Sequence, residues 1–254
     1  MIRVLASGLR IHFLQLSRSA SDVLGITVWP ILYATIAYYM FGAESDPRVL
    51  LTASLGATVM AIWSSVAFGS GGAIELQRRL GTLELLVAAP VPFGAVLAPI
   101  TIATSAIGVY ALAATLLWGR LLFGIPLHFE HPLMFALSLP VAIVAIGMLG
   151  LVLASTLIFY RASLFLGASF EYPGWLVMGL LVPLSVLPGW VAPISWLLAP
   201  TWGMRAIRES TIGGSPLRAI AMCLALSACY AVIAVAFLRA FERLARERAT
   251  LALT

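Results

Sequence analysis

Long apolar stretches that alternate with short polar turns run through almost the whole chain. They cover about residues 23–41, 49–68, 91–118, 133–159 and 217–237, and a further helix is expected from about Ala162. An α-helix needs about 20 apolar residues to cross a bilayer. With 62% hydrophobic residues, 10% charged residues and a mean hydropathy of +1.05, the chain could not cover itself with a water-soluble surface. The sequence therefore predicts an all-α integral membrane protein, with six spans in one transmembrane domain over residues 1–254.

The distribution of charge predicts how this domain is oriented. The chain has 15 basic and 10 acidic residues, and every basic residue is arginine, which we interpret as the mark of a GC-rich bacterial genome. In a six-span topology, one side carries ten arginines and the other carries Arg48, Arg120, Arg205, Arg208 and Arg218. Positive charge is enriched on the cytoplasmic side of membrane proteins. We therefore expect both termini in the cytoplasm of a multi-pass bacterial inner-membrane protein surrounded by lipid, and we interpret the positive charge as topological, with no nucleic acid as partner.

The two ends of the chain have amphipathic or charged helical patterns. In residues 1–20, Leu5, Leu9 and Phe13 share one helical face, and arginines point away from it. This pattern predicts an interfacial helix lying on an anionic leaflet. After the last span, residues 239–248 continue as a charged helix, in which Glu242 and Arg246 are spaced for an i,i+4 pair.

A region rich in proline and tryptophan precedes the last span. Four prolines recur there, and regular helix cannot cross that many: Pro183, Pro188, Pro193 and Pro200. The region is nevertheless apolar, and Trp190, Trp196 and Trp202 have a spacing that suits the membrane–water boundary. We expect an external re-entrant helical hairpin over residues 183–210, with short broken helices whose free backbone groups are covered by protein or water.

One short polar segment between the second and third apolar stretches concentrates four charged side chains within ten residues. It consists of Glu75, Arg78, Arg79, Leu80, Gly81, Thr82, Leu83 and Glu84, with an intervening Leu76-Gln77. The charges can make charge-assisted contacts with a soluble partner, while leucines at helical spacing can fill a groove. We therefore predict a cytoplasmic helix over residues 75–87 that grips a partner. The alternative is an ordinary loop that is charged only to hold the topology.

This segment resembles a known family. Glu75, the pair Arg78-Arg79, the run from Gly81 to Glu84 and then Pro90 resemble the coupling segment of type-two ABC exporter permeases, which include polysaccharide, teichoic-acid and daunorubicin-type drug exporters. The resemblance extends over nearly the whole chain. In the proline region it rests on Pro183, Leu187, Pro188, Gly189 and Trp190, which look like the outer gate of that family together with Pro200.

The resemblance implies a transport subunit that is not an enzyme by itself. Such a permease works with an identical or homologous second permease and with two copies of a separate ATPase subunit, which bind ATP and Mg. The chain has no phosphate-binding loop and no lysine to supply its cation, so the energy is expected to come from that partner. The expected substrate is a hydrophobic or amphipathic drug or lipid-like molecule, and the alternative is a polysaccharide or lipid-linked glycan.

The sequence contains two other candidate sites. Glu171 departs from the family pattern and is a candidate for the substrate path if its helix begins near Ala162, but it is an ordinary cytoplasmic residue if the helix begins at Pro173. His128, Glu130 and His131 have a spacing that could hold a metal, but we interpret them as an external solvated loop and expect no metal site.

Two rival functions of other classes remain open. An ion-coupled secondary carrier would need ionisable groups within the membrane, and Glu171 is the clear candidate. A non-transporting membrane scaffold or sensor would have neither an ATPase partner nor a flux.

Overall fold

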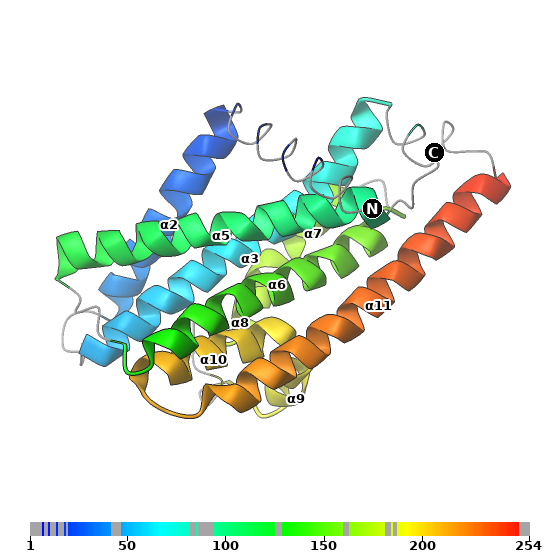
Figure 1. Cartoon of the computed structure of the whole chain (residues 1–254). Coiled ribbons are helices and arrows are strands. Elements are labelled where there is room, and N and C mark those ends of the chain that lie inside the picture. Colours follow the sequence, from blue (N-terminus) through cyan, green and yellow to red (C-terminus); the bar gives the residue numbers. More distant parts are fainter. Residues whose placement is uncertain are drawn as a thin grey trace.

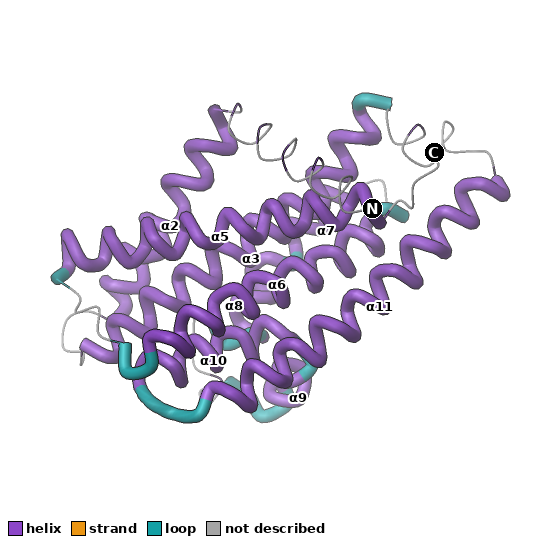
Figure 2. Tube along the Cα trace, viewed as in Figure 1, coloured by secondary structure: helices purple, strands orange, loops and turns teal. Residues whose placement is uncertain are grey.

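The computed structural model describes residues 7, 10, 14, 18, 20–41, 47–81, 85, 94–124, 129–159, 163–180, 184 and 187–248. In these parts of the chain the regular structure is helical throughout (Figures 1 and 2). The helices are α2 (Ala20–Phe41), α3 (Pro47–Arg79), α5 (Gly94–Phe123), α6 (Pro132–Leu157), α7 (Ser163–Ser169), α8 (Glu171–Val177), α9 (Val191–Trp196), α10 (Ala199–Ile212) and α11 (Pro216–Arg248). The predicted all-α class is therefore confirmed for the described residues.

Helix α3 lies at the centre of the bundle, where it packs against α2, α5, α6 and α7. Helix α11 lies along one outer side of the bundle and packs against α6 and α10 (Figure 1). Three segments of the described chain are long and apolar enough to cross a membrane, namely Leu50–Gly69, Pro132–Leu157 and Pro216–Leu244. These segments indicate a membrane protein. Most of the first is buried within the protein, whereas only 22% of the apolar window in the last is buried.

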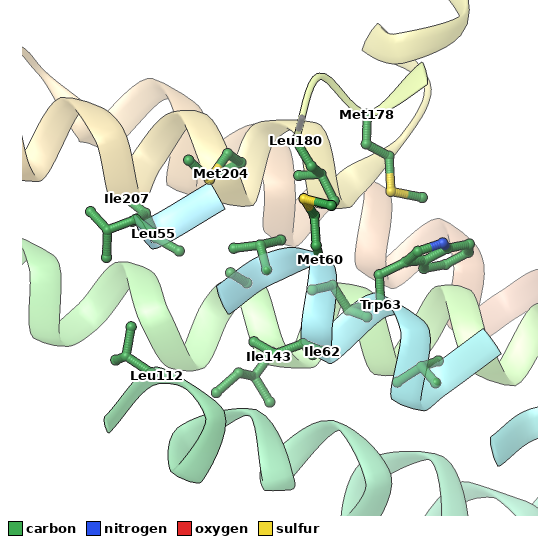
Figure 3. Close-up of a cluster of buried hydrophobic side chains, with 14 of the residues drawn as sticks. Leu55, Met60, Ile62, Trp63, Leu112, Ile143, Met178, Leu180, Met204 and Ile207 are labelled. Carbon is green, nitrogen blue, oxygen red and sulfur yellow. The ribbon is translucent and has the colours of Figure 1, made fainter. Parts of the chain in front are cut away.

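The largest cluster of buried side chains lies where α3, α5, α6 and α10 meet. Leu55, Ile62 and Ile143 pack there with Met204 and Ile207 from α10 (Figure 3). Because apolar surface between helices does not by itself drive association in lipid, close van der Waals packing has to hold such a bundle together. The short helix α10 contributes to this core and is therefore a structural part of the bundle as well as a connection.

Small residues let the central helices approach closely. A Cβ atom on Gly150 of α6 would lie 2.2 Å from Cγ1 of Val66 of α3, and one on Gly147 would lie 2.8 Å from Oγ of Ser105 of α5. Such distances are shorter than atoms tolerate. The glycines of α6 therefore serve packing within this chain.

Helix α3 differs from the sequence-based expectation at its carboxyl end. A span was expected over 49–68, followed by a separate helix over 75–87, but α3 continues from Pro47 to Arg79 without a break. Glu75, Arg78 and Arg79 consequently form the end of the same helix that contains the apolar segment. The glycines at 69, 71 and 72 did not end the helix; Gly69 instead lies against Thr104 of α5, so tertiary packing outweighs their low helix propensity.

The region between α6 and α11 is divided into short helices. Helix α7 begins at Ser163, close to the expected start near Ala162, and a turn at Phe170 separates it from α8, so the helix does not run unbroken past Glu171. The alternative start at Pro173 does not match the structure, because Pro173 lies inside α8. The prediction that prolines break the next region into short helices is confirmed by α9 and α10. The charged tail is helical through Arg248, as expected.

Several expectations fall outside the described residues. They are most of the interfacial helix over 1–20, the continuation of the charged segment at Thr82, Leu83 and Glu84, Pro183 in the proline region, and His128.

Candidate functional site

The carboxyl end of α3 carries the charged side chains of the predicted coupling segment. It rises away from the neighbouring helices at one end of the molecule (Figure 1). Nε of Arg79 lies 3.0 Å from Oε1 of Glu75, one turn earlier, and the Arg79 side chain is 72% exposed. Leu80 is 62% exposed. An apolar side chain beside an exposed ion pair is a surface that a soluble protein can contact.

A tight turn ends this helix. Gly81 has φ +65°, in the left-handed region that favours glycine, and its N–H donates to the carbonyl oxygen of Arg78 at 3.1 Å. This is the way in which many helices end. Among the described residues, no atom lies within 4 Å of the position of a Cβ on Gly81, so the backbone conformation is the reason for glycine here.

Arg78 connects the same segment to the end of α6. Its guanidinium Nη2 donates to the carbonyl oxygen of Ile158 at 3.0 Å, and Ile158 is 2% exposed. Carbonyl groups at the carboxyl end of a helix lack partners within the helix and carry partial negative charge, so an arginine stabilises them. Of the two adjacent arginines, Arg78 therefore holds α3 against α6, while Arg79 faces outward.

The candidate outer-gate residues lie in a different part of the bundle. Pro188, Gly189 and Trp190 are exposed just before α9, and Leu187 is partly buried. Pro200 is buried in the first turn of α10. The described members of this group therefore differ in exposure: three are exposed, Leu187 is partly buried and Pro200 is buried.

Two of the tryptophans in this region are exposed and one is buried. Trp190 is 66% and Trp196 is 62% exposed, whereas Trp202 is 7% exposed and donates from Nε1 to the carbonyl oxygen of Trp196 at 2.9 Å. The Arg205 guanidinium lies 5.5 Å from the centre of the Trp202 ring, and its Nε lies 2.7 Å from Oε1 of Glu209. The exposed Trp190 and Trp196 suit a membrane–water boundary.

Glu171, the candidate for the substrate path, is buried at the start of α8. It is 4% exposed. The hydroxyl of Tyr33 on α2 donates to its Oε1 at 3.4 Å, which is long for such a bond, and the indole Nε1 of Trp63 on α3 donates to its backbone carbonyl at 3.1 Å. Within the described chain, no arginine forms an ion pair with this carboxyl group.

A row of aromatic rings passes through Tyr33, the residue whose hydroxyl contacts this carboxyl group. The Trp29 ring stacks on Tyr33 with 5.8 Å between centres, Tyr33 meets Trp175 edge-on at 5.3 Å, and Trp175 meets Tyr172 edge-on at 5.0 Å. Trp29 and Tyr172, at the ends of the row, are 54% and 64% exposed, whereas Tyr33 in the middle is 7% exposed. The row therefore runs from the surface at Trp29 to the buried Tyr33, which contacts the carboxyl group, and back to the surface at Tyr172.

Sequence reasoning singled out Glu171 but missed its neighbours. Tyr33, Trp63 and Trp175 come from three helices, and Tyr33 is 138 positions away from Glu171. The signal that could have found part of this cluster is local, since Glu171 and Trp175 are one helical turn apart. Gly174 lies between them in the same turn. A Cβ atom at this position would lie 2.4 Å from Nε1 of Trp63, so a glycine here allows α8 to approach α3 closely.

The described residues contain no group of three or more His, Cys, Asp or Glu side chains that could hold a metal ion. A search of protein-family models finds none that matches this chain, and no curated protein matches it either.

Proposed function

We propose that the chain is the membrane-spanning subunit of an ATP-driven exporter in the bacterial inner membrane. The observation that carries this proposal is the end of α3, because one continuous helix joins an apolar segment long enough to span a membrane to an exposed charged tip. A partner that pushes on this tip moves the buried centre of the bundle with it. An ordinary topological loop would need no such rigid connection.

The proposed topology has six spans with both termini in the cytoplasm. In it, α2 and α5 cross the membrane together with α3, α6 and α11, and the broken pair α7 and α8 supplies the fifth crossing. Residues 1–20 form an interfacial helix, and residues 183–210 form an external re-entrant hairpin. Two permeases, identical or homologous, assemble with two ATPase subunits that bind ATP and Mg, and residues 75–87 make the coupling contact.

The proposed substrate is a hydrophobic or amphipathic molecule, such as a drug or a lipid-like compound, that leaves the cytoplasm or the inner leaflet. A polysaccharide or lipid-linked glycan is the alternative. The exposed side chains on α2 and α11 support an apolar substrate, because a compound dissolved in the bilayer can reach them directly. They include Trp29, Leu32 and Tyr39 on α2 and Val232 and Phe237 on α11.

Reconstitution with the ATPase tests the function. The chain is co-expressed with the ABC-type ATPase subunits of the same genome, and ATP-driven transport into or out of proteoliposomes is measured with and without vanadate. Arg79→Glu reverses the exposed charge and is expected to abolish vanadate-sensitive transport while the complex stays folded. Arg218→Glu, at an exposed arginine near the start of α11, is the matched control and is expected to leave transport intact. Transport by the Arg79 variant at the unaltered rate would reject the proposal.

One observation favours a second candidate, an ion-coupled carrier. A buried carboxyl group within a bundle of apolar helices is what such a carrier needs, and Glu171 provides one. The same proteoliposomes separate the two functions. A carrier transports when an ion gradient is imposed without ATP, whereas the exporter requires ATP and stops with vanadate.

A further inference from the structure

We propose that Glu171 and the aromatic rings around it form a binding site for a lipophilic organic cation, of the quaternary ammonium or phosphonium class. That such a cation is also exported rests on the proposed function above, but its binding to the chain does not.

First, Glu171 has no arginine as counter-charge among the residues that the structure describes. Trp63 and Ser64 line the cluster from within the segment Leu50–Gly69, so the carboxyl group lies beside a helix long enough to span the membrane. A charge at such a depth is costly unless it is paired or hydrated. Its side chain receives one long hydrogen bond, from Tyr33, and no arginine of the described chain pairs with it. A bound cation would supply the counter-charge.

The second argument is the chemistry of the surrounding rings. Cations are attracted to the faces of tryptophan and tyrosine rings within about 6 Å of the ring centre, and most strongly where water is excluded. Tyr33 contacts the carboxyl group directly, and the row that continues from it to Trp29 on one side and to Trp175 and Tyr172 on the other offers further rings nearby. A small, strongly hydrated ion would find too few oxygen atoms here. A bulky cation with apolar substituents matches both the rings and the charge.

The third argument concerns access. Trp29 and Tyr172 are exposed on the sides of α2 and α8, so an apolar cation can reach the ends of the row from the bilayer. The Tyr33 hydroxyl covers the carboxyl group through a bond at the long limit, which costs little to break. The indole Nε1 of Trp175 is buried without an acceptor, so the inner ring is not fixed by a hydrogen bond of its own. The two inner rings can therefore separate to admit the ligand.

The position of α8 allows this movement. It is a helix of seven residues between the turn at Phe170 and Gly179, which has φ +68°. A short segment bounded by turns can shift without moving the long central helices.

Equilibrium binding of two matched ions tests the site. The purified full-length chain is placed in nanodiscs of neutral phosphatidylcholine without any ATPase, and the binding of radiolabelled tetraphenylphosphonium and of tetraphenylborate is measured. These ions have the same shape and opposite charge. Saturable binding is expected for the phosphonium ion, and Glu171→Gln is expected to weaken it by about tenfold or more, because it removes the charge and keeps the size. Glu130→Gln, at an exposed carboxyl group, is the control and should bind like the unaltered chain.

A second variant covers the case in which Glu171→Gln fails to fold, as judged by its elution and thermal unfolding. Trp175→Leu keeps the carboxyl group and removes one ring, and it is expected to weaken phosphonium binding several-fold. If a folded Glu171→Gln or Trp175→Leu protein binds the phosphonium ion with unchanged affinity, the proposal is overturned. It is also overturned if Glu171→Gln weakens binding of the borate ion as much as it weakens binding of the phosphonium ion. Because no ATPase is present, this outcome is independent of whether the chain is an exporter.

Discussion

At the scale of single residues, Gly150 limits how closely α6 and α3 can pack. Replacing it with alanine would place a Cβ 2.2 Å from Cγ1 of Val66, so one of the two helices has to shift. Overpacking of this kind costs about 1–3 kcal/mol. We expect Gly150→Ala to lower the free energy of unfolding by this amount, measured by denaturation in mild detergent.

The same measurement has two controls. Gly189→Ala adds a methyl group where no atom of the described residues lies within 4 Å, and it should leave the free energy of unfolding almost unchanged. Val66→Ala combined with Gly150→Ala removes the clashing methyl group, so part of the stability should return. A Gly150→Ala protein as stable as the unaltered chain would show that the helices are not in this close contact.

The two adjacent arginines at the end of α3 are expected to respond differently to substitution. Arg78→Gln removes a charged donor from the buried carbonyl of Ile158, which costs about 1.5–3 kcal/mol. Arg79→Gln breaks only an exposed i,i+4 pair, worth about 0.3–0.5 kcal/mol. Thermal unfolding of the two variants should therefore differ clearly, and equal losses would contradict the contact between α3 and α6.

The charged residues at the end of α3 show which parts of the candidate site could be predicted from the sequence and which could not. The chemical type of Glu75, Arg78 and Arg79 marked them as a polar cluster, because charges are rare in this chain. The different roles of the two arginines depend on Ile158, 80 positions from Arg78, and no local pattern contains that pairing. The buried environment of Glu171 escaped prediction for the same reason.

At the scale of helices, hydrophobic patterning predicted most of the long elements. The stretches 23–41, 133–159 and 217–237 lie almost entirely within α2, α6 and α11. The ends of these helices were harder to predict than their centres, because an apolar stretch ends where the membrane ends, whereas a helix can continue into water. Helix α3 continues in this way to Arg79, and α11 continues to Arg248.

The short helices were harder to predict than the long ones. The prolines correctly indicated broken helices between α8 and α11, since proline lacks an N–H group and restricts the residue before it. They did not reveal that α10 would be buried, with Met204 and Ile207 in the main core. Burial of a short helix depends on the helices around it, and these are distant in sequence.

At the scale of the whole molecule, labelling of single cysteines distinguishes the six-span topology from one in which only three helices cross. Cys223 and Cys229 are first replaced by alanine, and cysteine is then introduced at Leu80, Glu130 or Trp190, all of which are exposed. Labelling of intact cells with a membrane-impermeant maleimide is measured against labelling of lysed cells.

The two topologies differ at Glu130. If α2 and α5 cross the membrane, the cysteine at position 130 is on the outer side. The cysteines at positions 130 and 190 should then be labelled in intact cells, whereas the cysteine at position 80 should be labelled only after lysis. If only α3, α6 and α11 cross, position 130 lies on the same side as 80. Protection of position 130 in intact cells would therefore contradict six spans.

The central claim is that an ATPase binds the charged tip of α3, and co-purification measures it most directly. The affinity-tagged chain is expressed with the ABC-type ATPase subunits of the same genome, and the ATPase retained on the tagged protein is quantified. We expect an ATPase to be retained by the unaltered chain and by Arg218→Glu, and to be lost with Arg79→Glu. Equal retention in all three proteins, or no ATPase retained by the unaltered chain, would contradict this claim.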